Sequence, residues 1–236
     1  MSHSKKVKAF FDNTDNYLKN NSNISLRKRI IKTLIGDKKG NSILDVGCGD
    51  GELSKDYIYK NNVDFFDISL NMLNILKKKI NQDGIDSIRF IQGDFLNYRF
   101  DKKYDVILFV GVLAHVDSTK ISIKKVSDLL NKNGIAIFQF TNASNLIGMF
   151  IHLYYNNFYS FFGKNKNYRL NKIKFDDFNS ELEKNRLTLK KKISYSSLLP
   201  GMGLLSKELR SSFQNYTIKN HISFYGSEVF LKVEKI

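Results

Sequence analysis

The stretch that decides the fold is Ile43-Leu44-Asp45-Val46-Gly47-Cys48-Gly49-Asp50-Gly51. It opens with four residues of strand-like, mostly apolar character, and three glycines follow at alternate positions. Glycine has no Cβ, so it adopts positive φ and lets another group lie directly against the backbone. A strand, a glycine-rich turn and the start of a helix are typical of a nucleotide-cofactor site at the carboxyl edge of a parallel sheet.

Strands and helices alternate on both sides of this stretch. Apolar runs predict strands over 42–46, 63–68, 87–92, 104–110, 134–141, 187–195 and 228–234. Helices are expected over 52–60, after Ser69 and over 121–130, and the continuous apolar run 104–110 is typical of a central strand. Such alternation predicts an α/β, Rossmann-like fold with a seven-stranded, mostly parallel sheet and helices on both faces.

The 236 residues are expected to form a single domain with two additions. Residues 1–37 form a helical lead-in, where apolar residues recur at spacings of three and four and Gly36 is a C-cap candidate. Residues 142–186 are rich in aromatic side chains and are expected to form a lid or a wall around the substrate. The uncharged run 141–163 is interrupted by polar residues, which argues against a transmembrane helix.

The composition limits the partners and the location. The net charge of +15 invites a nucleic-acid interpretation, but the lysines are scattered and greatly outnumber the arginines that base and phosphate recognition favours. Cys48 is the only cysteine, which excludes an internal disulfide, and its place between two glycines indicates a small residue that fits there. The N-terminus has no apolar stretch typical of a secretory signal, so a cytoplasmic protein is expected.

Two further acidic positions follow expected strands: Asp67 after the second, and Gly93-Asp94 after the third. With the glycine stretch, they make residues 38–141 resemble the class I S-adenosylmethionine-dependent methyltransferases, in the small-molecule branch of that family. Two positions depart from the family pattern. Phe66 replaces a small residue before the ribose acid, which makes Asp64 a rival for that role, and Asn131-Lys132-Asn133-Gly134 replaces a Pro-Gly-Gly turn.

The resemblance implies S-adenosyl-L-methionine as cofactor, S-adenosyl-L-homocysteine as product, and no metal. Asp67 would hold both ribose hydroxyls, because a carboxylate accepts two hydrogen bonds at once. Asp94 would accept from the adenine amino group, and the carbonyl of Val110 would receive the ammonium of the methionine portion. The remaining cofactor candidates are the turn residues Asp45, Gly47, Cys48 and Gly49, the apolar or aromatic neighbours of adenine Ile68, Met72 and Phe95, and Tyr17, which either closes over the cofactor or packs in the core.

A Rossmann dehydrogenase is the main rival at the level of the motif. Its fingerprint places the third glycine one position later, where this chain has Glu52. The downstream Gly93-Asp94 also has no role in that fingerprint, so the dehydrogenase interpretation is disfavoured.

The sulfonium cofactor is an activated methyl donor, so such an enzyme mainly positions the acceptor and excludes water. A general base helps when the acceptor is a hydroxyl or a protonated amine, and His115, after the fourth strand, is the candidate. The alternative is that His115 holds its loop by hydrogen bonds. Further candidates for substrate contact are His152, Tyr154, Tyr155, Tyr168, His221 and Tyr225.

The leading hypothesis is methyl transfer to an oxygen or nitrogen of a small-molecule acceptor such as a sugar, a natural-product ring or another metabolite. A second is a membrane-proximal methyltransferase of a lipid-linked acceptor, because basic residues from Lys164 to Lys174 follow the uncharged aromatic run. An RNA methyltransferase is a weaker alternative. A third hypothesis is a non-catalytic module with the cofactor fold, which would bind the cofactor weakly or not at all.

Overall fold

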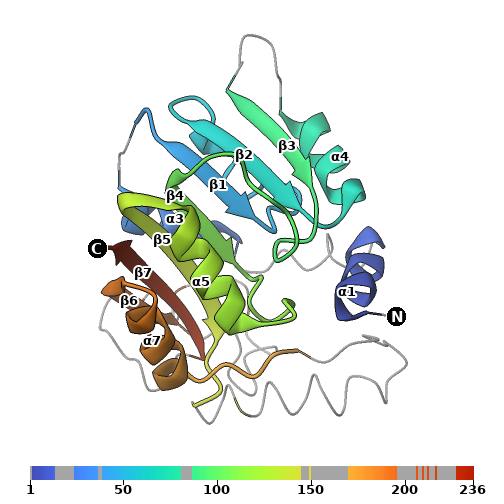
Figure 1. Ribbon diagram of the computed structural model, residues 1–236. Coiled ribbons are helices and arrows are strands. Elements are labelled where there is room, and N and C mark those ends of the chain that lie inside the picture. The colour runs from blue at the N-terminus through green and yellow to red at the C-terminus, as the bar shows by residue number, and fades with distance from the viewer. Residues whose placement is uncertain are drawn as a thin grey trace.

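A computed structural model describes residues 2–13, 24–36, 39–80, 87–144, 170–195 and 227–236, together with a few single residues between 149 and 216. These residues form a seven-stranded sheet with helices on both faces (Figure 1). The predicted Rossmann-like fold is therefore confirmed.

The sheet has the order β3-β2-β1-β4-β5-β7-β6, and β7 runs antiparallel to both of its neighbours. The strands are β1 (Ser42–Val46), β2 (Asn62–Asp67), β3 (Ile88–Gln92), β4 (Tyr104–Val110), β5 (Leu130–Thr141), β6 (Leu187–Tyr195) and β7 (Glu228–Lys235). Because β1 to β5 are parallel, their last residues meet at one edge, which we call the carboxyl edge. The opposite edge, where these strands begin, is the amino edge.

The helices divide between the two faces of the sheet. They are α1 (His3–Asp12), α3 (Ile24–Ile35), α4 (Leu70–Lys79), α5 (Thr119–Leu129), α7 (Phe175–Lys184) and the 3₁₀ helix η1 (Lys55–Tyr57). Figure 1 shows α5 and α7 on the near face, α3 behind the sheet and α1 beside the ends of β2 and β3. One apolar cluster joins the strands to α5 and α7, and a second joins them to α3 and α4.

Local sequence explains where several elements begin. The hydroxyls of Ser69 and Ser118 accept hydrogen bonds from the backbone of Met72 and Ile121, and so cap the first turns of α4 and α5. β4 lies in the middle of the sheet, and its run from Val106 to Phe109 is fully buried. Hydrophobic burial on both faces thus fixes the strand that the apolar run predicted.

The observed bounds differ from the predicted ones in two places. The helix predicted over 52–60 is reduced to turns around η1, because a helix of so few residues is marginal without an extensive packed face. Within the aromatic-rich range 142–186, α7 packs its Phe178 ring against Phe138 and Phe140 of β5 and belongs to the helical layer of the sheet.

Candidate active site

The glycine turn after β1 occupies the carboxyl edge and needs its glycines. Gly47, Gly49 and Gly51 have φ of 67°, 55° and 73°, in the left-handed region that other residues rarely adopt. A Cβ on Gly47 would collide with the Val112 side chain, and one on Gly51 would collide with Leu76. The turn is therefore shaped both by backbone conformation and by close packing.

Cys48 and Asp45 are buried beside this turn. The Cys48 side chain is 8% exposed, and burial raises the pKa of its thiol, so the sulfur stays protonated and packs as a small side chain. Asp45 is 4% exposed and accepts a hydrogen bond from the Ser54 hydroxyl. Burial raises the pKa of Asp45 to about 7, while the Ser54 hydrogen bond opposes the shift and the charge of Asp67 adds to it.

Asp67 ends β2 and is tied to the glycine turn. One carboxylate oxygen accepts from the Gly49 amide at 2.8 Å, and the other accepts from the Ser69 amide at 2.8 Å. Burial raises the pKa of Asp67, and these backbone hydrogen bonds oppose the shift. Each oxygen has a second lone pair, so the carboxylate can still accept from a ligand.

The residues after β3 form a turn whose side chains have partners within the protein. Asp94 accepts from the Leu96 amide at 3.0 Å and from the Asn97 side chain at 3.1 Å, so it shapes its own turn. Phe95 is 5% exposed and packs against Phe66 and Phe109 in the core, which leaves its ring little surface for a ligand.

The other candidates for cofactor contact lie around the same edge. Ile68 is half-buried, whereas Met72 of α4 is only 1% exposed and packs in the core. Val110 ends β4 and pairs with Gln139 of the neighbouring strand. Tyr17 lies outside the described residues, as do His152, Tyr154, Tyr155, Tyr168, His221 and Tyr225.

Helix α1 contributes residues to this edge that the sequence alone did not single out. Asp12, its last residue, accepts from the Ser69 hydroxyl at 2.6 Å and, through its carbonyl, from the Asn71 amide group at 2.9 Å. Its negative charge adds to the raised pKa of Asp67. The apolar stripe of α1 indicated packing, but only the fold shows that this packing lies beside Asp67.

His115 lies in the loop after β4 and contacts the same helix. Its ring stands edge-on to Phe11 with ring centres 5.2 Å apart, and its carbonyl lies 3.1 Å from His3 Nε2. Asn171 holds the loop from the other side: its side-chain amide donates to the carbonyls of Leu113 at 3.0 Å and Val116 at 2.6 Å. The histidine therefore occupies a loop of fixed shape at the carboxyl edge, between α1 and the segment before α7.

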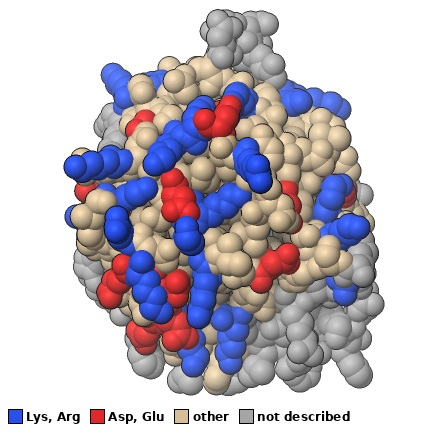
Figure 2. All heavy atoms as spheres, in the orientation of Figure 1, with Lys and Arg blue, Asp and Glu red and all other residues tan. Residues whose placement is uncertain are grey.

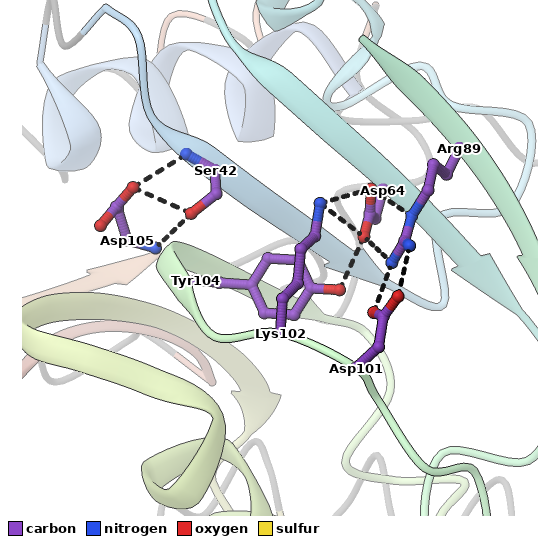
Figure 3. A network of polar contacts seen from close by, with 7 residues as sticks. All are labelled: Ser42, Asp64, Arg89, Asp101, Lys102, Tyr104 and Asp105. Atoms are coloured by element: carbon purple, nitrogen blue, oxygen red, sulfur yellow. Dashed lines mark hydrogen bonds and ion pairs between the residues drawn. The ribbon is translucent and has the colours of Figure 1, made fainter.

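Asp64 does not belong to this site. It is 1% exposed and lies in a network at the amino edge (Figure 3). Arg89 binds its carboxylate at 2.8 Å, Lys102 lies at 3.2 Å, and the Tyr104 hydroxyl donates at 2.6 Å. Asp64 lies toward the start of β2 and Asp67 at its end, and strand alternation turns the two side chains to opposite faces of the sheet. The rival assignment of the ribose acid to Asp64 is wrong.

The order and direction of the strands, with a glycine turn at the carboxyl edge, define a Rossmann-like α/β protein. Residues 43–134 match the family model of the methyltransferase domain. The structure resembles magnesium protoporphyrin IX methyltransferase from Synechocystis with bound S-adenosylhomocysteine, at a TM-score of 0.68 and 16% identity, with 100% of both chains covered.

Two curated relatives show the extent of the sequence likeness. The probable (S)-tetrahydroprotoberberine N-methyltransferase 2 of Papaver bracteatum is 33% identical over 102 residues, which are 42% of this chain and 28% of that protein. The demethylmenaquinone methyltransferase of Lactococcus lactis is 29% identical over 172 residues, 67% of this chain and 68% of that protein. The chain spans between 28% and 52% of the length of three curated relatives.

These likenesses confirm the resemblance to the class I S-adenosylmethionine-dependent methyltransferases that the glycine stretch and Asp67 indicated. Within the described part of the chain, no helix has the length and apolar character needed to cross a membrane. The same residues contain no group of three or more His, Cys, Asp or Glu side chains placed to hold a metal ion.

Proposed function

We propose that the chain transfers a methyl group from S-adenosylmethionine to an oxygen or nitrogen of a small-molecule acceptor. The observation that carries the proposal is the hydrogen bond from the Gly49 amide to Asp67, which connects the glycine turn after β1 to the acid that ends β2. This arrangement suits an adenosyl ligand, because Gly47 of the turn is exposed and the acid retains lone pairs for ribose hydroxyls. The cofactor supplies an activated methyl group.

The chain's own residues would bind and orient that cofactor at the carboxyl edge. Asp67 would accept from the ribose, the turn from Gly47 to Gly49 would lie against the methionine portion, and the Val110 carbonyl would accept from its ammonium. Asp94 would present its remaining lone pairs to the adenine amino group, beside Ile68. Tyr17 would close over the cofactor, and the part of the range 142–186 that precedes α7 would cover the acceptor.

His115 is the proposed general base. The loop that carries it is held by Asn171, and its ring packs against Phe11 of α1. A fixed position is what a base needs to reach the proton of a bound hydroxyl or ammonium. Replacing His115 with Ala is expected to lower turnover more than cofactor affinity. Turnover near that of the wild type from pH 6 to 9 would show that His115 only holds its loop.

The surface charge gives the nucleic-acid alternative no further support. Figure 2 shows Lys and Arg side chains spread over the visible face with Asp and Glu between them, and not gathered into one stripe. The membrane-proximal alternative depends on residues 141–174, most of which lie outside the described residues. Its test is co-sedimentation with anionic vesicles, and binding that falls with salt would favour it.

The direct test is calorimetric titration of the chain with S-adenosylmethionine, S-adenosylhomocysteine and NAD. We expect the two adenosyl ligands to bind at one site with micromolar or tighter affinity, and NAD to bind far more weakly. Absence of binding by both adenosyl ligands would favour the non-catalytic module. Preferred binding of NAD would favour the dehydrogenase interpretation.

A further inference from the structure

A second polar group lies at the carboxyl edge, on the side of β5 and β7. Gln139 of β5 is 3% exposed and Glu228, the first residue of β7, is 6% exposed. The Gln139 side-chain amide donates to Glu228, and the Thr141 hydroxyl donates to the other carboxylate oxygen at 2.6 Å. We call these three residues the Gln139–Glu228 cluster. None of the three belongs to a motif that stands out in the sequence.

The cluster has more acceptors than donors. Gln139 Oε1 is buried and has no hydrogen-bond partner. The Glu228 carboxylate forms no ion pair with any described Lys, Arg or His side chain. A buried acceptor without a donor and a buried carboxylate without a cation each cost free energy. Both deficits would be removed by one positively charged donor.

Tyr195 of β6 contacts Arg27 and lies beside Glu228. The Tyr195 hydroxyl accepts from Arg27 Nε at 3.3 Å, and Tyr195 is the register partner of Glu228. Burial raises the pKa of Tyr195 to about 12, with the guanidinium of Arg27 opposing the shift and the charge of Glu228 adding to it. The charges of Arg27 and Glu228 therefore both act on the buried Tyr195 hydroxyl.

The unpartnered oxygen faces the loop after β4. Gln139 pairs with Val110, and Gln139 Oε1 lies 3.7 Å from the position that a Cβ would take on Gly111. Gly111 is exposed and has φ of 76°. The acceptor thus lies next to an open stretch of backbone at the carboxyl edge. The same loop carries His115 four residues further on.

We propose that the Gln139–Glu228 cluster is a subsite for a protonated amine, which donates to Gln139 Oε1 and offsets the charge of Glu228. The inference rests on the proposed function, which supplies two sources of such a group: the α-ammonium of S-adenosylmethionine and an amino group of the methyl acceptor. A hydroxyl would satisfy Gln139 Oε1 but would leave the carboxylate without a cation. A carboxylate or phosphate would be repelled.

The first arm of the test asks whether the cofactor is the source. S-adenosylhomocysteine and 5′-methylthioadenosine, which lacks the amino-acid portion, are titrated into the wild type and into Gln139→Met. If the cofactor ammonium occupies the subsite, the affinity for S-adenosylhomocysteine falls roughly 10-fold in the variant and that for methylthioadenosine is unchanged. Ile137→Met, on the same face of β5 and one pleat further from the edge, is the matched control and should change neither affinity.

The second arm asks whether the acceptor is the source. Ligand-observed NMR compares phenethylamine with its neutral analogue 2-phenylethanol on the chain saturated with S-adenosylhomocysteine. If an acceptor amine occupies the subsite, the wild type and Ile137→Met bind phenethylamine more tightly than the alcohol. Gln139→Met and Glu228→Gln should both lose this preference. Glu228→Gln keeps a side chain of the same shape, so it decides alone if Gln139→Met does not fold.

A positive result in either arm supports the subsite and identifies its source. The inference is overturned if folded variants match the wild type in both arms. Failure of the proposed function looks different, because then the wild type binds neither S-adenosylhomocysteine nor methylthioadenosine. The amine comparison on the unliganded chain would still test the subsite in that case.

Discussion

Buried acidic side chains have different surroundings at the two edges of the sheet. At the amino edge, Asp64 lies among Arg89, Lys102 and the Tyr104 hydroxyl (Figure 3). At the carboxyl edge, Asp45 and Asp67 are held by a hydroxyl and by backbone amides, without an ion pair to any described Lys or Arg. The first arrangement fastens three strands together. The second leaves carboxylate oxygens available to a ligand and lowers the stability of the fold, which is typical of binding sites.

Strand alternation separates the two groups within one strand. Asp64 points to the face covered by α5 and α7, whereas Asp67 points to the face covered by α3 and α4. The two acids are three residues apart and serve different purposes. We therefore expect substitutions at the amino edge to change stability, and substitutions at the carboxyl edge to change ligand binding or the pH dependence of stability.

The largest expected effect concerns Asp45 and depends on pH. Its folded pKa of about 7 lies above its ordinary value of 3.8, so the stability linked to this group is fully present below pH 4 and is lost as pH rises to 7. Asp45→Asn keeps an acceptor for Ser54 and does not titrate. As pH rises from 4 to 7, the free energy of unfolding of the variant should therefore increase relative to that of the wild type by up to about 4 kcal/mol. Urea unfolding of both proteins across this pH range measures the difference. If the free energies of unfolding of the two proteins change with pH in parallel, Asp45 is not buried as described.

The next effect concerns the amino edge. Asp64→Ala should lower the free energy of unfolding by about 3 kcal/mol, because it leaves the Tyr104 hydroxyl and part of Arg89 without their partner. Affinity for S-adenosylhomocysteine should not change. Asp101→Asn is the matched control: this carboxylate binds the same Arg89 but its side chain is 68% exposed, so the loss should be much smaller. A change of cofactor affinity in Asp64→Ala would break the division between the edges.

Asp67→Ala tests the opposite side of the division. Loss of two charge-assisted hydrogen bonds to the ribose should weaken cofactor binding by about 1–3 kcal/mol. Its effect on stability should be smaller than that of Asp64→Ala, because removing a buried charge offsets the lost bonds to Gly49 and Ser69. Calorimetry and urea unfolding of both variants give the two numbers. Unchanged affinity would refute the assignment of the ribose to Asp67.

The smallest effect concerns Ser69, which connects α1 to the start of α4. The Ser69 hydroxyl accepts from the Met72 amide and donates to Asp12. Ser69→Ala should cost about 1 kcal/mol of stability through the lost cap of α4. Ser118→Ala, at the cap of α5, is the control, since it removes a cap without touching α1. Equal protection of α1 amides from hydrogen exchange in both variants would show that Ser69 does not hold α1.

Much of the fold could be predicted from the sequence, because local patterns determine it. The apolar run of β4 and the alternating pattern of β6 predicted the observed bounds of both strands, and the helix expected after Ser69 is α4. The segment after Gly51 was predicted as a longer helix than η1. The length of this helix depends on how the chain returns to β2, and no local sequence pattern predicts that path.

The candidate site was predictable where residues follow one another, and not where the fold joins distant ones. The glycine turn and Asp67 could be located from spacing. The contacts of Asp12 with Ser69, and of Gln139 with Glu228, join residues 57 and 89 positions apart. Spacing also cannot show that the Phe95 ring turns into the core, because that depends on the neighbouring Phe66 and Phe109.

The most direct test of the account is a crystal structure of the chain with S-adenosylhomocysteine. The account predicts that the adenosyl group lies across the ends of β1 and β2, with its ribose hydroxyls within hydrogen-bond distance of Asp67 and its amino-acid portion against the turn at Gly47. A ligand bound away from the carboxyl edge, or a ribose that does not touch Asp67, would contradict it.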